Sequence, residues 1–482
     1  MSTTWKWNVA MLIVALVVVW ISHWLYRWSN PKCNGKLPPG SMGFPIIGET
    51  VDFFEPCGFN EVPSFIKKRM IRYGPLFRTN LFGSKTVVST DPDVNFQIFR
   101  QDNTSFELGY PDIFVTVFGK NNVFLKDISI HKYLKNLTMQ LLGPEGLKGT
   151  MISHMDRAIG DHFKLKASQG SFDVRKEVES MVLSYMTPIL LSNLKAETQS
   201  KFIHSLEAFN LDWFRSFLSL STWKALIKTL KSRKEAIQVI EDVLRTRKES
   251  KVKEGDFVNT MLEEMEKEGS FFNQGSAINF LFILSFVTRE GTSSCTAVVV
   301  KNILQNPKRE HKAIAGVLSW ENYRKNMTFT HMVINESLRL FNTSPLMFRK
   351  AVKDDQIKGK NYFKFICLLL WAGYTIPAGW IVAVAPSVVH YDPTIYENPF
   401  EFNPWRWEGR EMIWGSKTFM AFGGGVTLCM GAEFARLQMA IFVHHLITYY
   451  DVSLVQECEI VRTPFPQFTK GLLIKISESP SN

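Results

Sequence analysis

The 482-residue chain has few cysteines, and they lie far apart. They are Cys33, Cys57, Cys295, Cys367, Cys429 and Cys458. No two form a Cys-x-x-Cys pair, which excludes a disulfide scaffold or a zinc ribbon and favours a reducing compartment. The sequence also lacks a Walker loop and the G-x-G-x-x-G, H-E-x-x-H and G-x-S-x-G motifs, so it carries no common nucleotide, zincin or serine-hydrolase signature.

Internal linkers, repeats and charge runs are missing as well. With 45% hydrophobic and 21% charged residues, the composition is that of a globular protein, which excludes disorder. No Pro/Gly/Ser-rich stretch divides the interior, so one large domain is possible despite the length. The 56 basic and 45 acidic residues give a net charge of +11, spread along the chain. Without a basic arm we expect no nucleic-acid partner, and the basic surface suits membrane lipid or an acidic protein.

One apolar run stands at the N-terminus. Residues 7–26 contain no Asp, Glu, Lys or Arg and, at about 1.5 Å per residue, span a bilayer core of about 30 Å. Basic residues follow the run at Arg27, Lys32 and Lys36, which predicts a cytosolic body. A cleaved signal peptide is the alternative, but no small-x-small site follows. We predict an anchor at 1–28, a proline/glycine-rich hinge at 29–48 and a catalytic domain at 49–482.

The body has mainly helical periodicity. A β-branched pattern in 52–90 predicts an antiparallel strand pair, and 92–345 is helical, with spacing such as that of Ile237, Ile240 and Leu244. Strands and turns follow residue 345 before a last helix and strand pair. The sequence therefore predicts a mainly α protein with a small β part.

Residues 422–431, FGGGVTLCMG, are the most informative stretch. Successive glycines let the backbone approach a flat partner closely, and Cys429 stands just before a helical pattern, where amide groups stabilise a thiolate. Taken alone, this pattern fits a metal ligand, a nucleophile or an inert cysteine in a glycine turn. No neighbouring histidine is an evident base for a nucleophile.

Two further motifs precede this loop. Glu336 and Arg339 are three residues apart on one helix face, and Arg406 in the sequence PWRW (404–407) can complete an ion network. The order E-x-x-R, P-x-R-W, F-x-x-G-x-x-x-C-x-G resembles the cytochrome P450 monooxygenases. The resemblance extends over the whole chain and is greatest to plant enzymes that oxidise steroids and triterpenoids.

The resemblance implies a haem (iron protoporphyrin IX) with Cys429 as the axial ligand of its iron. The other positions that match haem-binding residues are Phe422, Gly425, His131, Lys135 and Arg349. Glu336, Arg339 and Arg406 match the structural ion network of the family. The family's cavity positions fall on Phe114, Phe118, Phe286, Leu346, Met347 and Phe348, and candidate reductase-docking residues are Lys132, Lys135, Lys417 and Arg436.

The chain departs from the family at several places. The distal helix, expected over 277–293, carries Glu290, but glycine stands at 291 where the family has threonine. Thr292 lies one residue after the family's threonine position. One residue along a helix rotates the side chain by about 100°, so we expect Thr292 to point away from the distal site. We predict Glu290 and Thr292 as the catalytic pair. Thr427 replaces a propionate-binding arginine, and 360–373 has the form of an insertion.

The implied activity is hydroxylation of an apolar, steroid- or triterpenoid-like substrate. It would use O2 and electrons from an NADPH-dependent flavoprotein reductase, with a single-pass anchor in the endoplasmic reticulum membrane and a cytosolic catalytic domain. Two alternatives remain open. A peroxide-using haem-thiolate isomerase or dehydratase would need neither the reductase nor the missing threonine, and a degenerate copy would have no activity.

Overall fold

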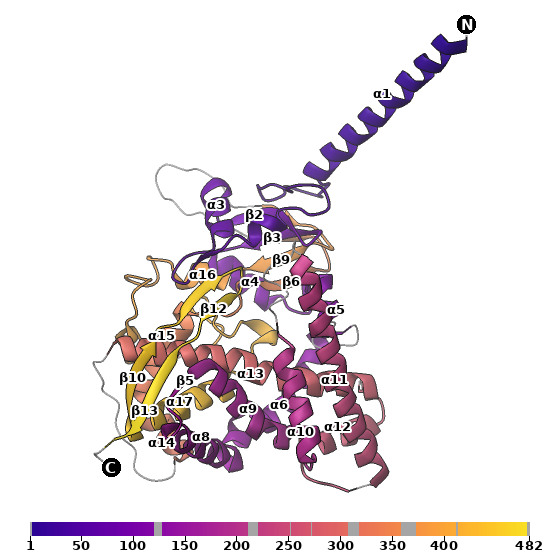
Figure 1. The fold of residues 1–482 in the computed structure, drawn as a ribbon. Helices are drawn as coiled ribbons and strands as arrows, with labels where there is room; N and C mark the ends of the chain where they lie inside the picture. The colour runs from indigo at the N-terminus through magenta and orange to yellow at the C-terminus, as the bar shows by residue number, and fades with distance from the viewer. Residues whose placement is uncertain are drawn as a thin grey trace.

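The computed structural model describes residues 2–119, 128–210, 220–250, 252–270, 272–306, 318–357, 373–410 and 413–479. Figure 1 shows one long helix, α1 (Ser2–Ser29), projecting away from a body of packed helices and small sheets. The predicted class, mainly α with a small β part behind an apolar N-terminal helix, is confirmed. Apart from Gly373, the predicted insertion at 360–373 lies outside the described residues.

Helices make up most of the body. They are α2 (Thr50–Phe53), α3 (Ser64–Tyr73), α4 (Pro92–Arg100), α5 (Asp112–Phe118), α6 (Ile128–Leu142), α7 (Pro144–Gly146), α8 (Ile152–Ala167), α9 (Val174–Leu190), α10 (Ala196–Ala208), α11 (Leu220–Ser250), α12 (Phe257–Glu266), α13 (Gln274–Gln305), α14 (Trp320–Lys325), α15 (Thr328–Leu340), α16 (Pro386–His390) and α17 (Ala432–Tyr449). Three short turns are the π-helical η2 (Leu147–Met151) and the 3-10 helices η4 (Pro404–Trp407) and η5 (Gly425–Thr427).

The strands form small sheets beside the helices. They are β1 (Cys57–Gly58), β2 (Leu76–Leu81), β3 (Ser84–Ser89), β4 (Phe106–Leu108), β5 (Ser171–Asp173), β6 (Met347–Ala351), β7 (Asp355–Ile357), β8 (Tyr374–Ile376), β9 (Ile381–Val384), β10 (Tyr450–Gln456), β11 (Glu459–Arg462), β12 (Pro466–Lys470) and β13 (Leu473–Glu478). The largest sheet has the order β2-β3-β9-β6-β4, and the predicted pair β2 and β3 is antiparallel. In this sheet β4 pairs with β6 and positions Arg349 opposite Leu108.

Helix α13 runs through the centre of the body, where it packs against α9, α15 and α17. Most of its apolar side chains are buried, as expected of a core helix, and Val287 is an exception. Asn273 caps its N-terminus by accepting the amide N–H of Ser276 at 2.9 Å. Because α13 is fixed at its start and packed along its length, it provides a rigid wall for the interior cavity.

The segment after α1 is fastened to the large sheet. The carbonyl oxygens of Pro38 and Pro39 accept hydrogen bonds from the side chain and the amide of Arg78 on β2, at 2.7 and 2.8 Å. Gly40 has a φ of +151°, and a Cβ atom there would overlap the Arg78 backbone. The proline/glycine-rich stretch is therefore bound to the body at residues 38–40.

Candidate active site

An interior cavity of about 480 Å³ lies between α6, α13, β6 and the cysteine loop, residues 422–431. Its walls are mainly apolar. Of the predicted site residues, five line it: Cys429, Phe422, His131, Arg349 and Thr292. Gly425, Lys135 and Glu290 are not among the lining residues. Residues far apart in the sequence thus converge on one apolar space, the usual form of a small-molecule site.

The cysteine loop holds Cys429 at the cavity wall, just before α17. The Cys429 amide donates to the Phe422 carbonyl oxygen at 2.9 Å, which closes the loop. Gly425 has a φ of +67°, and a Cβ atom there would lie 2.5 Å from the Asp102 carboxylate. Glycine is therefore required at 425 because a side chain would displace Asp102.

The sulfur of Cys429 is open to the cavity although it lies deep in the protein. Burial raises the pKa of this thiol, and the Gly431 amide and the charge of Lys135 oppose the rise. A bound metal cation would deprotonate the thiol. Within the described ranges no cluster of three His, Cys, Asp or Glu side chains can hold a metal.

Arg349 is the one Lys or Arg side chain that lines the cavity among the described residues. Its Nε donates to Asp102 Oδ1 at 2.7 Å, and its Nη2 donates to the Thr427 hydroxyl. Burial, together with the charges of Lys135 and Arg349, lowers the pKa of His131 to about 4, so this imidazole is neutral near pH 7. The positive charge facing the cavity is therefore concentrated at Arg349.

The ion network predicted around Glu336 is assembled beneath the cavity. Glu336 accepts two hydrogen bonds from Arg339, at 2.8 and 2.9 Å, and one from Arg406 Nε at 2.9 Å. Trp407 Nε1 and the Asn403 amide also donate to this carboxylate, at 2.9 and 3.0 Å. Arg339 donates in addition to the carbonyl oxygens of His390, at the end of α16, and of Pro399 in the segment that follows it. These bonds fasten the segment before the cysteine loop to α15.

On α13, Glu290 points away from the cavity into an ion cluster. Its carboxylate pairs with Arg175 at 3.0 Å and with Arg289 at 3.2 Å. Gly291 and Thr292 both line the cavity, so Thr292 is not turned away from it as expected. The Thr292 hydroxyl, however, donates to the Thr288 carbonyl oxygen of its own helix. The catalytic roles of Glu290 and Thr292 stay predictions.

Replacing Gly291 by Thr tests the missing threonine. A Cβ atom at 291 would meet no other atom within 4 Å, so the new hydroxyl has room at the cavity wall. We expect unchanged haem content and, per NADPH consumed, more product and less hydrogen peroxide, because the hydroxyl adds a proton donor. The matched control is Thr292→Val. If Gly291→Thr lowers peroxide formation only when Thr292 is intact, Thr292 is the proton donor. The same conclusion follows if the wild type already forms little peroxide.

The residues predicted to line the substrate cavity also fall into two groups. Phe114, Phe118 and Met347 line the cavity, whereas Phe286, Leu346 and Phe348 do not line it and lie in the core. Among the docking candidates, Arg436 was predicted wrongly. It is 7% exposed, pairs with Glu433 and lies over the Trp414 ring, because α17 packs into the body. Sequence reasoning also missed Asp102, since no motif marks it.

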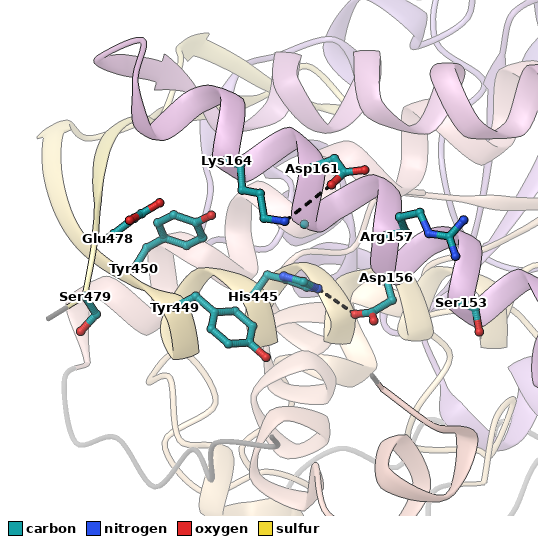
Figure 2. Close-up of a pocket in the computed structure, with 11 residues that line it drawn as sticks. Ser153, Asp156, Arg157, Asp161, Lys164, His445, Tyr449, Tyr450, Glu478 and Ser479 are labelled. Atoms are coloured by element: carbon teal, nitrogen blue, oxygen red, sulfur yellow. Dashed lines mark hydrogen bonds and ion pairs between the residues drawn. The ribbon is translucent and has the colours of Figure 1, made fainter. Parts of the chain in front are cut away.

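A second hollow, of about 590 Å³, lies on the surface between α8, the end of α17 and β13. Figure 2 shows the imidazole of His445 directed at Asp156, with Nε2 and Oδ1 2.7 Å apart. None of the predicted site residues lines this hollow. The chemistry implied by the sequence therefore belongs to the interior cavity.

An apolar interior cavity with the sulfur of Cys429 in its wall, a nearby buried cation and a glycine loop that permits close approach is the arrangement expected of a thiolate-ligated porphyrin protein. Comparison with known proteins identifies the family. The Cytochrome P450 family profile matches residues 38–478, and the chain belongs to this family. Haem is therefore its cofactor, and Cys429, Phe422 and Arg349 stand where they would hold it.

Individual relatives cover nearly the full chain. The chain is 55% identical to cytochrome P450 708A2 of Arabidopsis thaliana, over 98% of this chain and 99% of the relative. It is 32% identical to cucurbitadienol 11-hydroxylase of Siraitia grosvenorii, over 98% and 99% of the two chains. The retinoic-acid-bound cyanobacterial CYP120A1 has the same fold, with a TM-score of 0.76 at 22% identity over 92% of this chain and 100% of that one.

Proposed function

We propose that this P450 hydroxylates an apolar, steroid- or triterpenoid-like substrate at the endoplasmic reticulum membrane. O2 supplies the oxygen atom, and an NADPH-dependent flavoprotein reductase supplies the electrons. The observation that carries the proposal is the apolar cavity that reaches the sulfur of Cys429. Relatives named as hydroxylases of cucurbitadienol and cholesterol support the substrate class.

Each part of the site contributes to this reaction. Bound haem supplies the oxygen-activating chemistry of the family. The rings of Phe114, Phe118 and Phe341 line the cavity and favour an apolar substrate over water. Cys429 would hold the cofactor through its sulfur, and α13 bounds the cavity that would receive the substrate. Glu290 and Thr292 are the proposed route by which protons reach this space from the solvent.

The assembled network at Glu336 favours a working enzyme over the degenerate copy. Both oxygens of the fully buried Glu336 carboxylate accept hydrogen bonds. In a chain that is no longer under selection, we expect such a buried network to be lost. A peroxide-using isomerase or dehydratase is the second enzymatic candidate, and Gly291 favours it because such an enzyme needs no proton-delivering threonine. NADPH dependence of product formation separates the two.

The test is the absorption spectrum of the reduced, carbon-monoxide-bound protein, followed by turnover with reductase. We expect a strongly red-shifted Soret band and NADPH-dependent hydroxylation within a panel of plant sterols and triterpenes. An imidazole-like or absent band contradicts the haem-thiolate assignment. Product formed from a peroxide substrate without NADPH favours the isomerase or dehydratase.

The proposed anchor is α1. Among the residues that the structure describes, two helical segments are long and apolar enough to cross a membrane, Trp5–Ser29 and Gly425–Tyr449. The second is 56% buried and belongs to the core, whereas the first is 0% buried and projects from the body (Figure 1). With the proline/glycine-rich stretch 29–48 as hinge and 49–482 as catalytic domain, α1 would hold the body at the cytosolic membrane surface.

Deleting the residues up to Arg27 is expected to move the protein from the membrane to the soluble fraction on centrifugation, with the haem content kept. The reason is that the apolar side chains of α1 are exposed and none of them lines the cavity. Full-length Leu16→Asp is the matched variant, because a charge at mid-helix costs about 2.5–3.5 kcal/mol of insertion. Haem loss on truncation would contradict an independent catalytic domain.

A further inference from the structure

The buried cation of the cavity already has an anionic partner within the protein. Arg349 and Asp102 side chains are 3% and 1% exposed, and their Nε and Oδ1 atoms are 2.7 Å apart. A second bond joins Arg349 Nη2 to Asp102 Oδ2 at 3.3 Å. Asp102 follows the end of α4, and Arg349 lies on β6. This bidentate pair has no net charge and is shielded from water.

Most of the hydrogen-bonding capacity of Arg349 is also in use. A guanidinium has five N–H groups. Asp102 accepts two of them, the Phe348 carbonyl oxygen accepts one from Nη1 at 3.1 Å, and the Thr427 hydroxyl accepts one from Nη2. Counting only partners in the described part of the chain, one N–H group is left for a ligand in the cavity. A haem propionate meeting Arg349 therefore has to compete for it.

The same carboxylate reaches the cysteine loop. Asp102 Oδ2 accepts the amide N–H of Val426 at 3.2 Å, three residues before Cys429. Thr427 of the loop is joined to Arg349 as described. Asp102, Arg349 and Thr427 thus connect α4, β6 and η5 without any cofactor, and this connection fixes the loop ahead of haem binding.

Haem carries two propionates, which are anionic near pH 7. The cavity offers them a neutral His131 and an Arg349 whose charge Asp102 balances. Thr427 adds no charge where an arginine would have added one. The charge balance at this end of the cavity is therefore unfavourable to a dianion, and Asp102 is the residue responsible.

We propose that Asp102 sets the haem affinity of this protein by competing with a haem propionate for Arg349, while its bond to Val426 holds the cysteine loop before haem binds. The proposal rests on haem binding, a property of the family, and goes beyond the proposed substrate and reductase. Asp102 acts as a positioning residue through Arg349. Its removal should lower the stability of the haem-free protein and raise the affinity for haem.

Asp102→Asn in the full-length chain tests the proposal. Asparagine keeps an oxygen acceptor but removes the competing charge, so haemin titration of the haem-free protein should show roughly tenfold tighter binding. The melting temperature of the haem-free protein should fall, because Arg349 is left as a buried cation without an anion. The matched control is Asp93→Asn on α4, the helix that precedes Asp102, where Asp93 pairs with Lys417 near the surface. Its haemin affinity should not change.

Unchanged or weaker haemin binding by Asp102→Asn overturns the competition. Tighter binding with an unchanged melting temperature overturns the role in holding the loop. If Asp102→Asn does not fold, Thr427→Val decides, because it releases one Arg349 N–H group without changing charge. We expect haemin binding a few times tighter, and equal or weaker binding overturns the proposal. The carbon-monoxide spectrum separates a failure of this proposal from a failure of the haem-thiolate assignment. If the haem-thiolate assignment is wrong, the red-shifted band is absent from the wild type and from every variant.

Discussion

Cys429→Ser is expected to lose the red-shifted Soret band of the reduced, carbon-monoxide-bound form and, with it, NADPH-dependent turnover. A serine hydroxyl is a hard ligand that stays protonated, whereas the family's chemistry depends on a soft, electron-rich sulfur. The fold should survive, because the Cys429 side chain faces the cavity and its amide, which serine retains, closes the loop on Phe422. Absorption spectra and far-UV circular dichroism measure the two effects.

The matched control is Cys295→Ala. Cys295 lines the same cavity from α13, and burial, reinforced by the nearby Cys429, raises its pKa to about 12, so it stays a thiol near pH 7. The control should keep the red-shifted band. Loss of the band in Cys295→Ala together with an unchanged spectrum in Cys429→Ser would show that Cys295 is the ligand.

Glu336→Gln has the largest expected effect on stability. Its carboxylate balances Arg339 and Arg406, with Glu336 and Arg339 side chains 0% exposed. A neutral amide cannot balance the charge of two guanidinium groups. Its NH2 group would also face N–H donors that now bind a carboxylate oxygen. Removing one partner of a buried ion pair costs on the order of 3–5 kcal/mol. Chemical denaturation of the haem-loaded protein should show this loss, accompanied by reduced haem content, because the network holds the segment leading to the cysteine loop.

A surface pair provides the comparison for that experiment. Glu321 and Lys325 lie four residues apart on α14 with side chains 71% and 72% exposed. Glu321→Gln should leave stability unchanged within error, because water screens such a pair. A loss by Glu336→Gln no greater than that of Glu321→Gln would contradict a structural role for the buried network.

Much of the site could be predicted from local sequence. The position of Cys429, three residues before α17, followed from glycines and a helical pattern that are read directly along the chain. Glu336 and Arg339 share a helix face because of their spacing, and the apolar run of α1 has the length of a bilayer. In each case the relevant physics acts over a few consecutive residues.

The rest depended on contacts between distant segments. Asp102 reaches Arg349 across 247 positions of sequence, and only the pairing of β4 with β6 brings the two together. Thr292 lines the cavity in spite of its register, because a helix wall presents a broad face. Glu290 is directed toward Arg175 of α9, a partner that no spacing along α13 could indicate.

By itself the sequence determined the helical class, the apolar N-terminal helix, the glycine-rich loop that carries Cys429 and the family, because periodicity and motifs are local properties. Tertiary structure alone decided which charges are balanced. Arg349 proved to be paired with Asp102, Arg436 proved to be buried, and Glu290 proved to be bound to two arginines. The physical reason is that a side chain's charge state and availability depend on the groups that folding brings within a few ångströms of it.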